Sequence, residues 1–283
     1  MSRWTAPFVE RNGRFSPLKS AAFVGLFLPA AWIVGSALTG ALDPKPVTEM
    51  IHQTGDWAIR LLLVSLAITP LRRVTQWSKW IALRRMIGVS AFAYAIAHIC
   101  LYVVDQKFDL PHVASEIALR FYLTIGFVAL AGLGLLAATS TDAQIKRLGA
   151  ARWNRLHKAV YGIAIVALLH YYIQAKLDIS DPVLLTGFYV YLMLFRLAKT
   201  RSVNATLGLA TVIAPLVAGL AEASWYAVVR HISFLMVIEA NFSLEDDLRP
   251  AVKVAVAAVA ILVGRLGWPL LRSGRLPILS PAK

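Results

Sequence analysis

Eight long apolar stretches run through this chain, and they constrain its fold more than any other feature. They lie at residues 18–38, 55–71, 86–104, 120–138, 158–175, 182–198, 205–222 and 251–271. A helix needs about 20 mostly apolar residues to cross the hydrocarbon core of a bilayer, and its backbone groups are satisfied within the helix itself. The apolar residues show no period of two, which argues against a β-barrel. We therefore predict an all-α, polytopic transmembrane helix bundle.

The composition excludes most other classes of protein. Hydrophobic residues make up 58% of the 283 residues and charged residues only 16%, against roughly 25% charged residues in a soluble domain. Mean hydropathy is +0.65. A soluble enzyme or a disordered chain does not have this composition, and the single cysteine, Cys100, cannot form an internal disulfide. The excess apolar surface is expected to face the lipid bilayer.

The net charge is +14, and the charged residues are distributed unevenly among the segments between the apolar stretches. Basic segments alternate with acidic or balanced ones along the chain. The segment between the second and third stretches, for example, contains no acid but five basic residues, Arg72, Arg73, Lys79, Arg84 and Arg85. The next segment holds Asp105, Asp109 and Glu116. This alternation is the positive-inside pattern, so we predict eight spans with both termini in the cytoplasm and no nucleic-acid partner. Glu222, where the seventh stretch ends, is expected to cap that helix near the acidic face, and the alternative is that it carries protons.

Two histidines lie deep inside predicted helices. His98 follows Arg85 by 13 residues and His170 follows His157 by 13 residues. Both helices run in the same direction, so each histidine lies about 20 Å from the basic end of its helix. Two neutral imidazoles at matching depth can hold a haem iron between them, and the small residues Ala95 and Ala167 leave room nearby. The alternative is that each histidine forms an interhelical hydrogen bond.

His157 lies at the basic end of its helix, about 20 Å from His170, and this spacing suggests a second haem. No partner histidine is evident, because position 85 is an arginine. Four nearby cations either contact haem propionates or a flavin phosphate or serve only as a topology signal; they are Arg84, Arg85, Arg152 and Arg155.

Several strings in this order resemble a known family. They are GDWAIRLL at 55–62, ITPLRR at 68–73, RRMIG at 84–88 followed by Tyr94 and His98, and RWNRLHKAVY at 152–161 leading to His170. Together they resemble the MsrQ (YedZ) family, within the ferric-reductase-like transmembrane superfamily, over about residues 15–200. The resemblance implies a six-helix haem-binding core at 18–200, which follows a basic leader at 1–17 that the charge pattern places in the cytoplasm. Beyond residue 200 the chain departs from the family, and the C-terminal extension at 201–283 is predicted to add two further transmembrane helices.

The resemblance also implies a function. Members carry haem b, with FMN also attributed to the family, and the family's haem histidines correspond to His98, His157 and His170, which would serve one haem or two in this chain. It implies residence in the bacterial inner membrane and electron delivery to MsrP, a periplasmic molybdopterin enzyme that repairs oxidised methionine. The implied donor is a cytoplasmic flavin reductase or quinone. The alternatives are a transmembrane ferric reductase and, from another class, a cofactor-free transporter or assembly scaffold.

Overall fold

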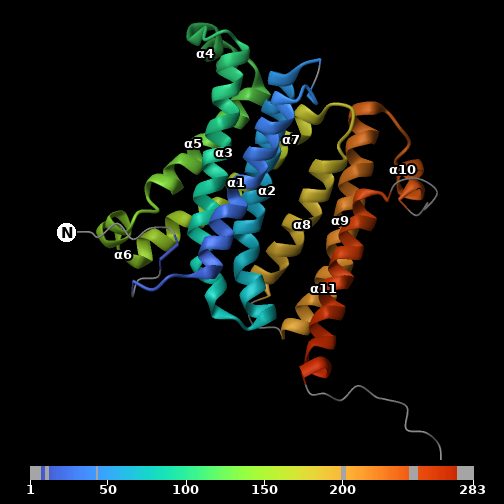
Figure 1. The fold of residues 1–283 in the computed structure, drawn as a ribbon. Helices are drawn as coiled ribbons and strands as arrows, with labels where there is room; N and C mark the ends of the chain where they lie inside the picture. Colours follow the sequence, from blue (N-terminus) through green and yellow to red (C-terminus); the bar gives the residue numbers. More distant parts are fainter. Residues whose placement is uncertain (1–7, 10–12, 43, 199–201, 242–247, 273–283) are drawn as a thin grey trace, which may run out of the picture. The chain divides into compact units, whose positions relative to one another are not determined.

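The protein is described by a computed structural model that covers residues 8–9, 13–42, 44–198, 202–241 and 248–272. Its described residues form helices and turns, with one isolated β-bridge between Val9 and Phe15, so the all-α prediction is confirmed. The chain divides into two compact units, of which unit 1 comprises 1–68 and 79–174 and unit 2 comprises 69–78 and 175–283. Figure 1 shows the helices in chain order.

Unit 1 holds the helices of the N-terminal two thirds of the chain. In order they are α1 (Pro17–Leu38), most of α2 (Pro46–Thr75), most of the short 3-10 helix η1 (Ser78–Ala82), α3 (Arg84–Asp105), α4 (Leu110–Leu119), α5 (Phe121–Ala138), α6 (Asp142–His157) and α7 (Ala159–Ala175). Apolar side chains on α1 point outward, among them Phe27 and Trp32. Such exposure suits a helix that faces lipid, because the apolar side chains then contact lipid tails instead of water.

Capping residues set the ends of the short helices in unit 1. Asp109 accepts a hydrogen bond from the amide of His112 at 3.0 Å at the start of α4, and Thr141 accepts one from the amide of Gln144 at 3.3 Å at the start of α6. Such caps satisfy amide groups that have no partner within the helix. Inside α6, Gly149 has φ 74°, which interrupts the helical backbone in a conformation that glycine adopts without strain.

Unit 2 is built from the end of α2 together with α8 (Ser180–Leu197), α9 (Val203–Arg230), α10 (Phe234–Ala240) and α11 (Pro250–Arg272). Small residues allow the three long helices to approach closely. A Cβ atom at Gly187 on α8 would lie 2.5 Å from Cγ2 of Val254 and 3.2 Å from Cβ of Ala218. Val254 and Ala218 are both fully buried. Contacts between small residues of this kind are typical of helix packing in membranes.

Each of the eight predicted apolar stretches coincides with a helix for most of its length. Six helical segments of the described chain are long and apolar enough to cross a membrane, namely α1, α2, η1 with α3, α5, α9 and α11 up to Gly267, and α6 with α7 forms a further candidate bent by 41°. α8 does not belong to this set. Asp181, Arg196 and the two tyrosines of α8, Tyr189 and Tyr191, lower its hydropathy. The orientation of the termini and the count of eight spans stay predictions.

The expectation for Glu222 is wrong. Helix α9 continues two turns beyond it to Arg230, and the Glu222 side chain is 1% exposed. Its carboxylate accepts a hydrogen bond from Nδ2 of Asn241 at 3.2 Å and forms an ion pair with Arg249 at 3.4 Å. Hydropathy places the end of the helix too early because a single buried acid lowers the local average, although a partnered carboxylate can lie inside a helix packing surface.

Candidate functional site

Unit 1 brings together two of the predicted site residues. His98 on α3 and His170 on α7 lie next to each other, with their ring centroids 6.3 Å apart and their planes at 83°. Both side chains are half-buried. The equal spacing of the two histidines from the basic ends of their helices predicts this juxtaposition, which needs α3 and α7 to run in the same direction.

Each imidazole is held through the same nitrogen. Nδ1 of His98 lies 2.8 Å from the carbonyl oxygen of Ile51 on α2, and Nδ1 of His170 lies 2.8 Å from the carbonyl oxygen of Tyr122 on α5. A carbonyl oxygen only accepts hydrogen bonds, so Nδ1 carries the proton and donates in both cases. Nε2 then keeps its lone pair, which is the tautomer that a metal-ligating histidine needs.

Two glycines provide the space in which these rings lie. A Cβ atom at Gly55 on α2 would lie 3.0 Å from Nδ1 of His98, and one at Gly126 on α5 would lie 2.8 Å from Cε1 of His170. Gly55 lies four residues after Ile51, and Gly126 lies four residues after Tyr122. Each glycine therefore lies on the same helix face as the residue whose carbonyl oxygen accepts the hydrogen bond. The α2–α3 pair and the α5–α7 pair therefore cradle their histidines in the same way.

The separation of the rings fits one metal ion between them. A bond from a metal to an imidazole nitrogen is about 2 Å long, and the ring centroid lies about 1 Å behind that nitrogen, so two axial imidazoles place their centroids about 6 Å apart. The observed 6.3 Å matches this value. Among the described residues there is no group of three or more His, Cys, Asp or Glu side chains that could hold a metal ion. Two protein ligands are sufficient for the axial positions of a haem.

The third predicted histidine has different surroundings. His157, the last residue of α6, stacks on Trp153 with centroids 3.9 Å apart, and its Nε2 lies 3.2 Å from the hydroxyl of Thr139. The Thr139 hydroxyl donates its proton to the carbonyl oxygen of Leu135 at 2.8 Å, so Nε2 of His157 is the donor to Thr139. In this arrangement Nδ1, not Nε2, is the nitrogen of His157 that is left for a metal.

No observed contact joins any of the four predicted arginines to His98 or His170. Arg85 is paired with Asp142 and also donates to the carbonyl oxygen of Ser140 at 3.2 Å. Arg84 acts electrostatically on His157. Arg152 and Arg155 are exposed on α6. All four belong to the basic end of unit 1, and their contacts with propionates or a flavin phosphate stay predictions.

Sequence reasoning missed the residues that orient the histidines. The acceptors from Ile51 and Tyr122 are backbone carbonyl groups, which any residue type supplies, so the sequence contains no signal for them. Gly55 lies inside the string GDWAIRLL, which carries part of the family resemblance. Its contact with His98, however, is visible only once α2 is packed on α3. Gly126 lies in an apolar run, where glycine is common for other reasons.

Comparison with known proteins agrees with this geometry. A family described as the ferric reductase like transmembrane component matches residues 54–168. The matched region begins beside Gly55, includes His98, Gly126 and His157, and ends two residues before His170. No solved structure matches the chain significantly. The helices and the histidine pair thus define the class of the protein, a ferric-reductase-like, multi-pass membrane component.

Curated relatives narrow the class to one family. The chain is 36% identical over 198 residues to the protein-methionine-sulfoxide reductase heme-binding subunit MsrQ of Caulobacter vibrioides, covering 68% of this chain and 94% of that protein. It is 38% identical to MsrQ of Rhodospirillum rubrum, over 66% of this chain and 88% of that protein. With MsrQ of Xanthomonas axonopodis pv. citri the identity is 41%, over 62% and 80%. The chain belongs to the MsrQ family.

Proposed function

We propose that this chain is a haem b electron-transfer subunit in the inner membrane of a bacterium. It takes electrons from a cytoplasmic reductant, a flavin reductase or a quinone, and passes them to an MsrP-like molybdopterin reductase that repairs oxidised methionine in periplasmic proteins. Two observations support the proposal: the relatives are named as heme-binding subunits of protein-methionine-sulfoxide reductase, and unit 1 brings two imidazoles, each hydrogen-bonded through Nδ1, to a centroid distance of 6.3 Å.

The histidine pair carries the proposal. His98 and His170 would supply the two axial nitrogens, and a bound haem b would supply a one-electron couple at its iron. The carbonyl oxygens of Ile51 and Tyr122 hold the rings in the ligating tautomer. Because each carbonyl draws on the Nδ1 proton, it also makes the opposite nitrogen a stronger donor to iron.

Further parts of the proposal rest on the family resemblance. His157 would ligate a second haem nearer the basic face, with Nδ1 as its free nitrogen or after release of Nε2 from Thr139. Arg84, Arg85, Arg152 and Arg155 would contact haem propionates or the phosphate of FMN. The exposed position of Arg152 and Arg155 suits an exchangeable ligand from the cytoplasm better than a buried cofactor.

The test is haem retention in purified variants. We expect the wild-type protein to show a Soret band and a reduced α-band of bis-histidine haem b, with haem and flavin quantified by pyridine haemochrome and fluorescence. His98→Ala and His170→Ala should each lose most of this haem. His112→Ala is the matched control, because His112 is exposed on α4. Full haem in both site variants would overturn the ligand assignment.

A transmembrane ferric reductase is the second candidate, and the description of the matching family favours it. The two activities differ in the electron acceptor. Pre-reduced protein should be oxidised faster by an MsrP-like reductase than by ferric citrate in stopped-flow absorbance at the α-band, and the reverse order would favour the ferric reductase. A colourless protein, produced with sufficient haem, would instead favour a cofactor-free transporter or scaffold.

A further inference from the structure

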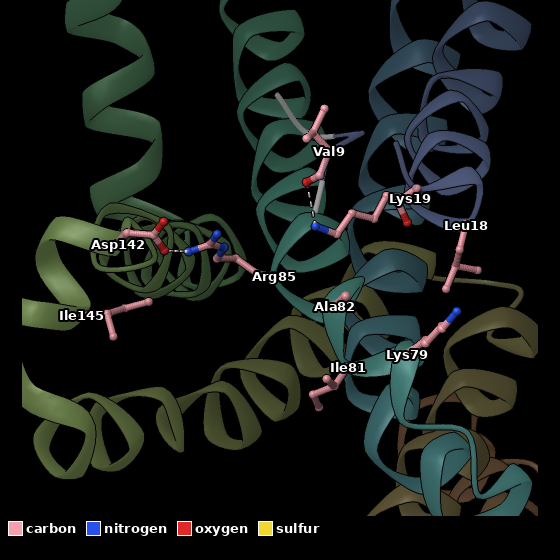
Figure 2. A pocket seen from close by; sticks show the side chains of 10 residues that line it. Val9, Leu18, Lys19, Lys79, Ile81, Ala82, Arg85, Asp142 and Ile145 are labelled. Atoms are coloured by element: carbon pink, nitrogen blue, oxygen red, sulfur yellow. Dashed lines mark hydrogen bonds and ion pairs between the residues drawn. The ribbon is translucent and has the colours of Figure 1, made fainter. Parts of the chain in front are cut away.

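Unit 1 contains a cavity of about 490 Å³ whose lining includes neither His98 nor His170. It lies where α1 and α3 begin and where α5 leads into α6 (Figure 2). Its volume falls in the range of about 300–1,000 Å³ that is common for small-molecule sites. The lining combines charged side chains with an apolar wall, and consists of Val9, Ser16, Leu18, Lys19, Lys79, Ile81, Ala82, Arg85, Asp142 and Ile145.

The charges in this cavity do not cancel. Arg85 and Asp142 form an ion pair with each other and so leave little net charge. Lys19 donates from Nζ to the carbonyl oxygen of Val9 at 3.1 Å, a neutral partner that leaves the ammonium charge in place. The ammonium group of Lys79 forms no hydrogen bond or ion pair with the described residues. Figure 2 shows the two lysines on the side formed by α1 and η1, away from the Arg85–Asp142 pair. Two positive charges are therefore available to an anion.

The apolar part of the lining lies beside those lysines. Leu18 belongs to the first turn of α1, and Ile81, which is 43% exposed, belongs to η1. Ala82 and Ile145 extend this wall. Inorganic phosphate would leave the wall without a partner, whereas a ligand with both an anionic head and an apolar body would cover it.

The position of the cavity along the helices points to the same kind of ligand. Helices α1, α3 and α5 are candidate membrane spans, and the cavity lies at the ends that bear basic segments. The ends of spans lie at the depth of the lipid headgroups, and Trp80 in η1 is a residue type enriched at that depth. Basic pockets between transmembrane helices on the cytoplasmic side attract anionic headgroups.

The geometry points to an anionic phospholipid as the occupant, with its phosphate between Lys19 and Lys79 and its acyl region along Leu18 and Ile81. This site does not include the histidine pair, and among the arginines proposed to contact a cofactor only Arg85 lines it, on the side away from the two lysines. A phosphate-bearing soluble molecule shares the anionic chemistry, but the apolar wall favours the lipid.

Native mass spectrometry after reconstitution tests the inference. The full chain is placed in vesicles of phosphatidylcholine with and without phosphatidylglycerol, and bound lipid is counted after release. We expect retained phosphatidylglycerol in excess over phosphatidylcholine. Since each lysine near a headgroup contributes about fivefold in binding, Lys19→Gln and Lys79→Gln should each weaken retention about fivefold. Lys146→Gln is the matched control, because Lys146 is exposed on α6 and does not line the cavity.

Charge and folding effects are separated by conservative variants. Lys19→Arg and Lys79→Arg should keep phosphatidylglycerol, and far-UV circular dichroism should show equal helix content in all variants. Equal retention in the glutamine variants, or equal binding of both lipids, would overturn the inference. Displacement of the lipid by inorganic phosphate or by FMN would also overturn it, because the site would then belong to a soluble phosphate. His98→Ala should lose haem but keep the lipid, so failure of one proposal is distinguishable from failure of the other.

Discussion

The hydroxyl of Tyr94 donates to the carbonyl oxygen of Leu26 at 2.8 Å. The same hydroxyl accepts from the amide of Ala30 at 2.9 Å, so it stands between the two groups of α1 that would bond each other in an uninterrupted helix. Pro29 is the neighbour of Ala30 inside α1, and a proline there disturbs the preceding turn. Tyr94 thus joins α3 to α1 one turn before His98.

We predict that Tyr94→Phe lowers the unfolding free energy by about 1 kcal/mol, because it removes one buried hydrogen-bonding group from the α1–α3 contact. The loss is small because Ala30 and Leu26 can then bond each other. The unfolding temperature in detergent is the measurement. Tyr102→Phe is the control, since no described residue forms a hydrogen bond with the Tyr102 hydroxyl. Equal effects of the two variants would contradict the prediction.

Gly126→Ala should remove most of the haem without unfolding the protein. The added methyl group would lie 2.8 Å from Cε1 and 2.9 Å from Nδ1 of His170, so the ring has to move away from the carbonyl oxygen of Tyr122. The ratio of haem to protein measures the effect. Gly162→Ala on α7 is the control, because nothing lies within 4 Å of a Cβ atom there. That variant should keep its haem and gain up to about 1 kcal/mol of stability from helix propensity. Unchanged haem in Gly126→Ala would show that the ring position is not required.

The helices and the histidine pair could be predicted from the sequence, and the reasons are physical. Apolar runs of span length have few alternatives to a helix in lipid. His98 and His170 are equally far in sequence from the basic ends of their helices. Because the rise per residue is constant in a helix, equal sequence spacing becomes equal depth in the folded bundle. Their equal depth follows once α3 and α7 run in the same direction.

The supporting contacts could not be predicted in the same way. The carbonyl oxygens of Ile51 and Tyr122 and the surface of Gly126 depend on which helix faces lie together, and hydropathy contains no such information. For His157 the sequence could not reveal the hydrogen bond to Thr139, which depends on how α6 folds against the end of α5. The sequence pattern sets His157 apart from the pair of His98 and His170, and the structure likewise gives His157 different surroundings.

We predict that the Asp178 carboxyl, between α7 and α8, makes the protein less stable at acidic pH. Hydrogen bonds from the hydroxyl and the amide of Ser180 hold the pKa of the Asp178 carboxyl below its usual value. A lowered pKa in the folded state stabilises the protein at pH values above the unfolded pKa of about 3.9, and this stabilisation is lost as the pH falls through the folded pKa. Unfolding temperatures from pH 7 to pH 3 should therefore drop less steeply in Asp178→Asn. Ser180→Ala, which removes the hydroxyl donor and leaves the Asp178 carboxyl in place, should give an intermediate slope, and parallel curves for all three proteins would disprove the assignment.

Glu222 should stabilise unit 2 as a hydrogen-bond acceptor more than as a charge. It accepts from Asn241 at 3.2 Å in a buried contact, while its ion-pair partner Arg249 is 41% exposed, and exposed partners contribute little. Glu222→Ala leaves the buried amide of Asn241 with one acceptor fewer and should cost about 1–3 kcal/mol of unfolding free energy. Glu222→Gln keeps an acceptor and should cost less than half as much. Glu239→Ala on α10 is the control, because Glu239 is exposed. Thermal unfolding of the three variants measures these differences. If Glu222→Gln were as unstable as Glu222→Ala, the charge of Glu222, and not its hydrogen bond, would stabilise the packing of α9 against its neighbours.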